Sequence, residues 1–165
     1  MLDDLTNLQA LLRDSTLLAP KGYIAGEWCD GENGQTFPVY NPARGDVITD
    51  VADISRTQTA EAISIAEKAQ KLWAARPAKE RSNLLRNWYN LMMENQEDLA
   101  TILTAEQGKP IEEAKGEIAY GASFIEFFAE EAKRVYGETI PGHQSDKRIT
   151  VLKQPVGVAA SITPW

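Results

Sequence analysis

Val156-Gly157-Val158-Ala159-Ala160-Ser161-Ile162 is the stretch that decides the fold class of this 165-residue sequence. The run is almost continuously apolar, and a strand with that pattern is typically covered on both faces, as in a parallel α/β sheet. Covered strands need neighbouring strands and helices, yet the sequence stops at Thr163-Pro164-Trp165, which would leave an open hydrogen-bonding edge. We therefore expect an incomplete α/β fold and a chain that is a fragment of something longer.

Upstream of that run, turn residues alternate with short apolar segments. Asn33-Gly34 tolerates the positive φ values of a tight turn, and this predicts a turn between strands at Tyr23–Ala25 and Thr36–Val39. Asn41–Asp46 predicts a second turn before a strand near Val47–Val51. Together these signals predict a small antiparallel meander. A further strand is expected over Ile149–Leu152, just before Pro155.

Three long helices are predicted between the β segments. The first begins near Ser55 or Thr57, whose hydroxyls can cap it, and the second begins with Pro77 in its first turn. Gly108 and Pro110 are expected to close the second helix. The third is predicted to run from about Ile111 to Tyr136 and to end at Gly137. Five aromatic side chains at helical spacing have aliphatic neighbours, which predicts a core position for Trp73, Trp88, Phe124, Phe127 and Phe128.

Composition excludes several classes of function. There are 17 Lys+Arg against 24 Asp+Glu, a formal charge of −7, so the counterion-releasing surface of a nucleic-acid or anionic-membrane partner is missing. A single cysteine excludes an internal disulfide, and with a single histidine it excludes a Cys/His zinc cage. Asp3 and Asp4 rule out a basic signal-peptide start, and no apolar run approaches the ~20 residues of a membrane span. We expect a cytoplasmic protein.

Few residues suggest chemistry by themselves. Cys29 lies between acidic neighbours, which would not lower the pKa of its thiol, so a structural role is favoured. His143 lies in a predicted loop with no orienting partner visible in the sequence. Lys109 could be imagined as a phosphate ligand, but Gly108 and Pro110 explain that motif as a helix stop. No metal-ligand spacing or glycine-rich phosphate loop is present, and the glutamates of the third helix predict a solvated face partly paired with lysine and arginine.

Several phrases, in order along the chain, resemble a known family. They are Ile24–Trp28, Asn41–Gly45, Arg86–Glu94, Glu106–Pro110, Ala132–Pro141, Lys153–Val158 and the terminal Ile162–Trp165. Their order and spacing resemble the N-terminal part of the NAD(P)-dependent aldehyde dehydrogenases, and within them the succinate-semialdehyde dehydrogenases most. The resemblance covers essentially everything from Tyr23 onward.

The resemblance implies an organisation and a cofactor. Residues 1–22 would be an N-terminal segment, 23–138 the β meander and helical part of the cofactor-binding domain, 139–155 a segment of the oligomerisation arm, and 156–165 the first strand of the dinucleotide-binding sheet. The cofactor, NADP or NAD, would lie beyond the carboxyl end of that strand. The residues implied to line its nicotinamide side are Ile162, Thr163, Pro164 and Trp165.

The same resemblance implies an oxidoreductase that converts a small aldehyde, succinate semialdehyde, to its acid, and a homo-oligomer in the full-length form. In the family the catalytic Cys, the oxyanion-binding Asn and the general-base Glu come after the position of Trp165, so no catalytic residue and no metal ligand is expected here. The chain itself is therefore expected to be inactive. The alternative is a non-catalytic helical interaction module that uses its exposed C-terminal strand to pair with another chain.

Overall fold

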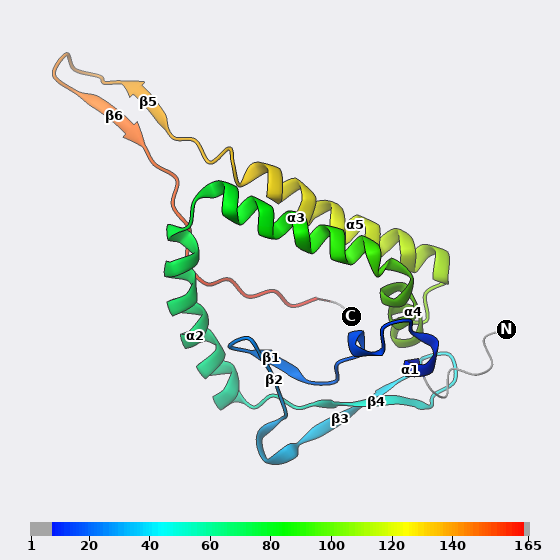
Figure 1. Cartoon of the computed structure of the whole chain (residues 1–165). Helices are drawn as coiled ribbons and strands as arrows, with labels where there is room; N and C mark the ends of the chain where they lie inside the picture. Colours follow the sequence, from blue (N-terminus) through cyan, green and yellow to red (C-terminus); the bar gives the residue numbers. More distant parts are fainter. Residues whose placement is uncertain (1–7, 164–165) are drawn as a thin grey trace.

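The computed structural model describes residues 8–163, in which short antiparallel ribbons flank a set of helices (Figure 1). The N-terminal ribbons and α2 (Arg56–Ala75) lie on one side of the molecule, and α3 (Ala78–Glu94) lies along α5 (Ile111–Glu131) on the other. A hairpin of β5 (Glu138–Pro141) and β6 (Arg148–Val151) projects away from the rest of the chain. Within residues 8–163 the strands are paired in three separate two-stranded sheets.

The predicted meander is wrong in its connectivity. β1 (Gly22–Ile24) pairs with β2 (Glu27–Cys29) through a tight turn at Ala25-Gly26, both with positive φ. β3 (Thr36–Tyr40) pairs with β4 (Val47–Ala52) across the predicted turn at residues 41–46. Asn33 and Gly34 do have positive φ, of 57° and 71°, but they lie in a short 3₁₀ turn between the two ribbons. Asn33-Gly34 predicts only the local backbone conformation of a turn. That conformation is also found in a turn that connects two ribbons, so it does not establish which strands pair.

The start of α2 agrees with the sequence. Ser55 is its N-cap: the hydroxyl oxygen accepts from the Gln58 backbone N–H at 3.2 Å, and the Gln58 side-chain oxygen accepts from the Ser55 N–H at 3.0 Å. This reciprocal pair is a capping box, which satisfies two backbone donors at the helix start. No residue of α2 is fully buried.

The predicted second helix is broken. α3 ends at Glu94, Asn95 leaves the helical region with φ −106° and ψ 17°, and α4 (Gln96–Gln107) starts in a new direction. The Asn95 side-chain amide donates to the Leu91 carbonyl at 2.9 Å, so it takes over a carbonyl at the end of α3. α4 stops at Gly108, whose φ of 79° and ψ of 8° are left-handed, as predicted.

α5 ends five residues before the predicted end at Tyr136. The Lys133 and Arg134 backbone N–H groups donate to the carbonyls three residues earlier, which tightens the last turn and stops the α-helix. Gly137, read from the sequence as the helix stop, serves a different purpose. A Cβ at this position would lie 2.3 Å from the Val151 carbonyl oxygen, so glycine allows the two strands of the projecting hairpin to approach.

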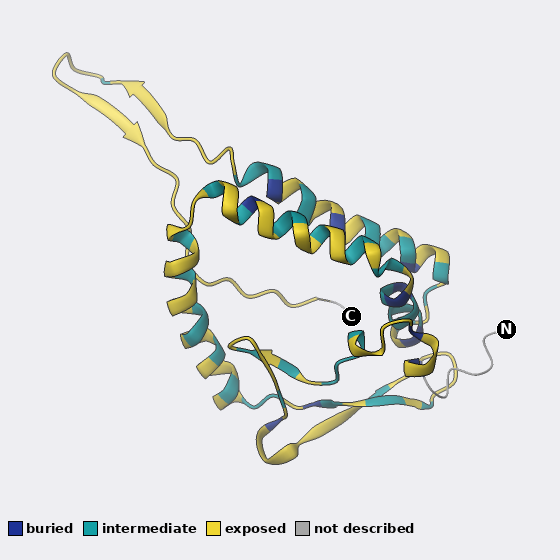
Figure 2. Ribbon diagram, viewed as in Figure 1, coloured by how far each residue is buried: buried dark blue, intermediate teal, exposed yellow. Residues whose placement is uncertain are grey.

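The helices pack through small residues. Ala100 and Ala105 of α4 and Ala114, Ala122 and Ala129 of α5 are buried, whereas no large side chain among residues 8–163 is completely buried. The predicted core position of the five aromatics is wrong: all are 40% exposed or more, with Trp88 at 55% and Phe127 at 57%. Alanine lets helix backbones approach closely, and Figure 2 shows that the helices also keep exposed faces. The exposures of the five aromatics place them away from the alanine contacts.

The deciding run forms no paired strand in this structure. Residues 152–163 adopt neither helix nor strand, Gly157 has a φ of 116°, and Val156 and Ile162 are 99% and 98% exposed. A strand needs a partner for its backbone groups, and the described residues place none beside it. The role of this run as a strand of a dinucleotide-binding sheet stays a prediction.

Candidate functional site

The segment predicted to border the cofactor lies at the end of the described chain. Ile162 and Thr163 are exposed, and Pro164 and Trp165 lie outside the described residues. An exposed apolar side chain beside a threonine hydroxyl can offer one wall and one hydrogen-bonding group to the carboxamide-bearing ring of a nicotinamide cofactor. Residues 8–163 do not enclose a site for NAD(P), and the cofactor role of this segment stays a prediction.

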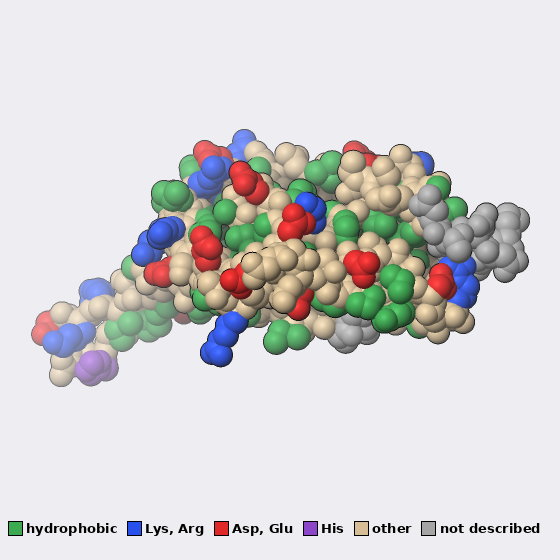
Figure 3. Space-filling view, turned by 90° about the horizontal axis from the view of Figure 1, so that it is seen from below, with side chains coloured by type: hydrophobic (Ala, Val, Ile, Leu, Met, Phe, Trp, Pro, Cys, Tyr) green, Lys and Arg blue, Asp and Glu red, His purple; other side chains and the backbone are tan. Residues whose placement is uncertain are grey.

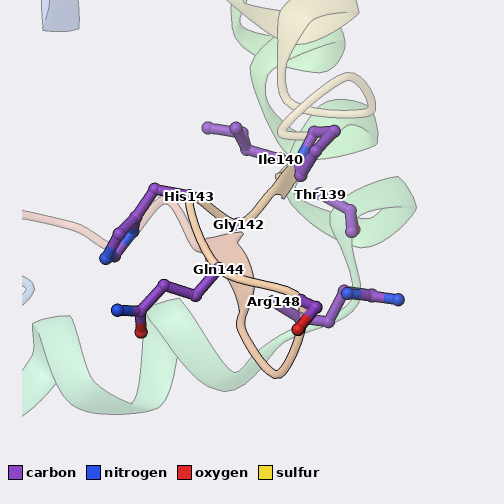
Figure 4. A pocket seen from close by; sticks show the side chains of 8 residues that line it. Thr139, Ile140, Gly142, His143, Gln144 and Arg148 are labelled. Atoms are coloured by element: carbon purple, nitrogen blue, oxygen red, sulfur yellow. The ribbon is translucent and has the colours of Figure 1, made fainter.

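His143 lies at the tip of the projecting hairpin, where the purple histidine in Figure 3 marks the end of the protrusion. A hollow of about 620 Å³ adjoins it, bordered by residues of β5, β6 and the loop between them. Figure 4 shows the His143 and Gln144 side chains pointing to one side of the hairpin, and Thr139 and Arg148 to the other. No carboxylate borders the hollow, so the arrangement holds no acid–base pair.

Cys29 lies on β2 and faces β1. Its thiol donates a weak hydrogen bond to the Gly22 carbonyl at 3.4 Å, in the register that pairs these two residues. The side chain is half-buried, and no cation contacts it among the interactions of the described chain. These contacts give Cys29 a structural role in the first ribbon, as the sequence indicated.

Lys109 lies at the joint between α4 and α5. Its ammonium group forms an ion pair with Glu117 of α5, while Gly108 turns the chain beside Pro42. The motif Glu106–Pro110 therefore makes a corner between two helices. This geometry agrees with the helix-stop interpretation, and the Glu117 carboxylate balances the charge of Lys109.

A network of charges joins α3 to α5. The Arg86 guanidinium donates to Glu126 at 2.5 Å and to Glu130 at 2.9 Å, and Lys133 donates to the second oxygen of Glu130 at 2.6 Å. The hydrogen bonds from Glu126 and then Glu130 raise the pKa of Arg86 above its ordinary value. Lys133, followed by Arg86, lowers the pKa of Glu130. Helical spacing in the sequence predicted the pairing of Lys133 with a glutamate. It could not predict the ion pairs of Arg86, because Arg86 lies on another helix.

Asp98 is a structural residue that the sequence did not reveal. It lies in the first turn of α4, its carboxylate is almost fully buried, and it accepts the backbone N–H groups of Arg13 and Asp14 at 3.1 Å and 2.9 Å. These hydrogen bonds, that of Asp14 first, hold the pKa of Asp98 below its ordinary value. Leu8 and Leu12 are buried beside this contact, so the N-terminal segment is anchored to α4. Acidic residues are common in the first turn of a helix, and Asp98 differs from them only by its contact with Asp14, 84 residues away in the sequence.

Two classes of site are absent from the described chain. No group of three or more His, Cys, Asp or Glu side chains among residues 8–163 is arranged to hold a metal ion. In the same part of the chain, the helices are all too short or too polar to cross a bilayer.

Comparison with known proteins defines the class. The aldehyde dehydrogenase family model matches residues 28–165. The chain is 60% identical over 154 residues to a glutarate-semialdehyde dehydrogenase of Pseudomonas putida, and 57% identical over 154 residues to the NADP-dependent succinate-semialdehyde dehydrogenase of Escherichia coli. Each match covers 93% of this chain and 32% of the relative.

Solved structures agree with the sequence matches. A crystal structure of an NADP-dependent enzyme from Escherichia coli superposes with a TM-score of 0.85 and 56% identity over 87% of this chain, which is 30% of that protein. A succinate-semialdehyde dehydrogenase from Burkholderia pseudomallei gives the same TM-score at 49% identity.

The chain belongs to the aldehyde dehydrogenase family. It spans about a third of the length of the curated relatives it matches, and its fold corresponds to part of theirs. The predicted family and the predicted incomplete α/β fold are both confirmed.

Proposed function

We propose that this chain contributes the N-terminal part of an enzyme that oxidises succinate semialdehyde to succinate with NADP or NAD. In that reaction the aldehyde carbon gives a hydride to the nicotinamide, and water supplies the second carboxylate oxygen. The observation that carries the proposal is the 57% identity to the succinate-semialdehyde dehydrogenase of Escherichia coli across nearly the whole chain.

Glutarate semialdehyde is the second candidate substrate. Two relatives named for it, from Pseudomonas putida and Pseudomonas aeruginosa, are 60% and 58% identical to this chain. The two aldehydes share a terminal carboxylate and differ by one methylene, which a pocket discriminates by only about 1–3 kcal/mol. Identity of this level across one segment of the protein supports the class of ω-carboxylated aldehydes more strongly than either member.

The residues of this chain have supporting roles in the proposal. Ile162, Thr163, Pro164 and Trp165 would border the nicotinamide, and NAD(P), when bound, would supply the hydride acceptor. Cys29 would take no part in the chemistry, because it is hydrogen-bonded to Gly22 within the first ribbon. The alternative of a non-catalytic module has no comparable support. Homo-oligomerisation through the projecting hairpin and a cytoplasmic location belong to the same proposal.

A chimeric enzyme tests the proposal. This chain would replace the matching N-terminal segment of the Escherichia coli enzyme, whose remaining sequence would follow Trp165. We expect formation of reduced nicotinamide from succinate or glutarate semialdehyde with the chimera and none with the 165-residue chain alone. A folded chimera that oxidises neither aldehyde would contradict the proposed function, and turnover by the chain alone would contradict the expected inactivity.

Two controls sharpen this experiment. Cys29→Ser in the chimera should retain full activity, because the thiol has only a structural hydrogen bond. A second chimera on the Pseudomonas putida enzyme would separate the two substrates. If the ratio of kcat/KM for the two semialdehydes shifts the same way in both chimeras, relative to each parent, this chain contributes to the preference.

A further inference from the structure

A hollow lined by positive charge lies where α2 ends and residues 153–157 leave the projecting hairpin. Two adjoining cavities, of about 400 and 500 Å³, share the lining residues Trp73, Arg81, Val135 and Lys153. Cavities of this size accommodate small organic molecules. Neither cavity includes Ile162 or Thr163, so the hollow is separate from the segment proposed to border the nicotinamide.

The Arg81 guanidinium is held in place by the backbone. Its Nη1 donates to the carbonyl oxygens of Ala74 at 3.2 Å and Arg76 at 2.6 Å, both at the end of α2. A guanidinium has five N–H donors in a fixed plane, and these two contacts use only one nitrogen. The remaining edge is pre-oriented for a planar acceptor such as a carboxylate, which arginine binds in a bidentate manner.

Lys153 adds a positive charge without a partner. Among residues 8–163 its ammonium group makes no ion pair or hydrogen bond, whereas Arg134, also in the lining, is paired with Glu131 at 2.6 Å. Glu131 also borders the first cavity, so Arg81, Arg134 and Lys153 against Glu131 leave the lining with an excess of positive charge in a molecule whose net charge is −7. Trp73, Leu85, Phe128 and Val135 provide apolar walls beside these charges.

We propose that this hollow binds a small organic carboxylate, with the carboxylate between Arg81 and Lys153 and the hydrocarbon part on the Trp73 ring. The apolar walls favour an organic acid over an inorganic anion, because they reward burial of a hydrocarbon body. The site is independent of the proposed dehydrogenase activity, and its test measures binding and not turnover.

Benzoate is the probe, added to the 165-residue chain in an NMR titration. The readout is the chemical shift of the side-chain indole N–H of Trp73. Benzyl alcohol keeps the ring without the charge, and inorganic phosphate keeps the charge without the ring. We expect a saturable shift with benzoate and shifts at least about fivefold weaker in affinity with the other two. Equal affinity for benzyl alcohol would show a merely apolar hollow, and equal affinity for phosphate a merely cationic one. Either result, or the absence of a saturable shift, overturns the proposal.

Matched lysine variants locate the charge. Lys153→Gln should weaken benzoate binding about fivefold, which corresponds to one exposed ion pair. Lys147→Gln, the same change in the loop of the projecting hairpin and outside both cavities, should leave it unchanged. Both lysines are exposed, so both variants are expected to fold. If Lys153→Gln binds benzoate with wild-type affinity, Lys153 does not contact the carboxylate, and the proposed position of the carboxylate between Arg81 and Lys153 is overturned.

Discussion

Gly108→Ala is the substitution whose effect follows most directly from the geometry. Gly108 has a φ of 79°, and alanine in the left-handed region costs about 1–2 kcal/mol. Reduced freedom of the unfolded chain offsets about 0.5 kcal/mol of this. The new Cβ would also lie 3.1 Å from Pro42 Cγ, so the ring must shift by a few tenths of an ångström. We expect the free energy of unfolding to fall by about 0.5–1.5 kcal/mol from the backbone alone, and by more if the Pro42 ring cannot shift fully.

Gly116→Ala is the matched control, because it makes the same chemical change inside a helix. Gly116 lies within α5, has no atom within 4 Å of its added Cβ, and alanine there should stabilise the chain by about 1 kcal/mol. Urea denaturation followed by far-UV circular dichroism measures both variants. The two should move the midpoint in opposite directions. A Gly108→Ala variant as stable as the wild type would refute the assignment of Gly108 as an obligatory left-handed stop, and would reopen the question of what the motif around Lys109 does.

Three further changes test other contacts. Ser55→Ala removes the capping box of α2 and should cost about 1 kcal/mol in urea denaturation, whereas Ser64→Ala, within the same helix, should cost much less; equal losses would argue against the cap. Asp98→Asn should release the N-terminal segment and speed tryptic cleavage after Arg13 at neutral pH, and unchanged cleavage would show that Leu8 and Leu12 suffice. Because the folded pKa of Asp98 lies below its unfolded value, the wild-type contact should be complete above pH ~3.9 and be lost only as the pH falls through the lowered value, which amide exchange of the Arg13 and Asp14 N–H groups would follow in acid. Gly137→Val would place side-chain atoms against the Val151 carbonyl and should speed amide exchange across β5 and β6, with no change expected in α3.

Local signals predicted the local features of the fold. The Ser55 N-cap, the turn at residues 41–46 and the left-handed Gly108 each depend on residues close in sequence, and each is present in the structure. Asn95 was missed because leucines continue at helical spacing on both sides of it. Its amide ends α3 through a contact with Leu91 that competes with helix continuation, and periodicity does not register such competition.

Long-range features were beyond the sequence patterns. Asp98 and Arg86 gain their roles from partners in other segments, and nothing nearby in the sequence identifies those partners. The aromatics show a second limit: helical spacing correctly put them on helices but did not reveal which face packs. The packed face of each helix is the one that carries the buried alanines, because two helices can approach closely only where both have small side chains. The cofactor-side residues were reached only through the family resemblance, and that assignment remains a proposal.

The anchoring of the N-terminal segment on α4 bears on the order in which the chain folds. Contacts between α3 and α5, such as Arg86 with Glu126 and Glu130, close loops of 40 and 44 residues, while the contacts of Asp98 with Arg13 and Asp14 close loops of 85 and 84. Loop-closure entropy rises only slowly with length, but the longer closure also needs α4 already formed to present its carboxylate. During synthesis, residues 8–17 would therefore wait without their partner until α4 has emerged, and the contacts of Arg86 with Glu126 and Glu130 would form later still, once α5 has followed.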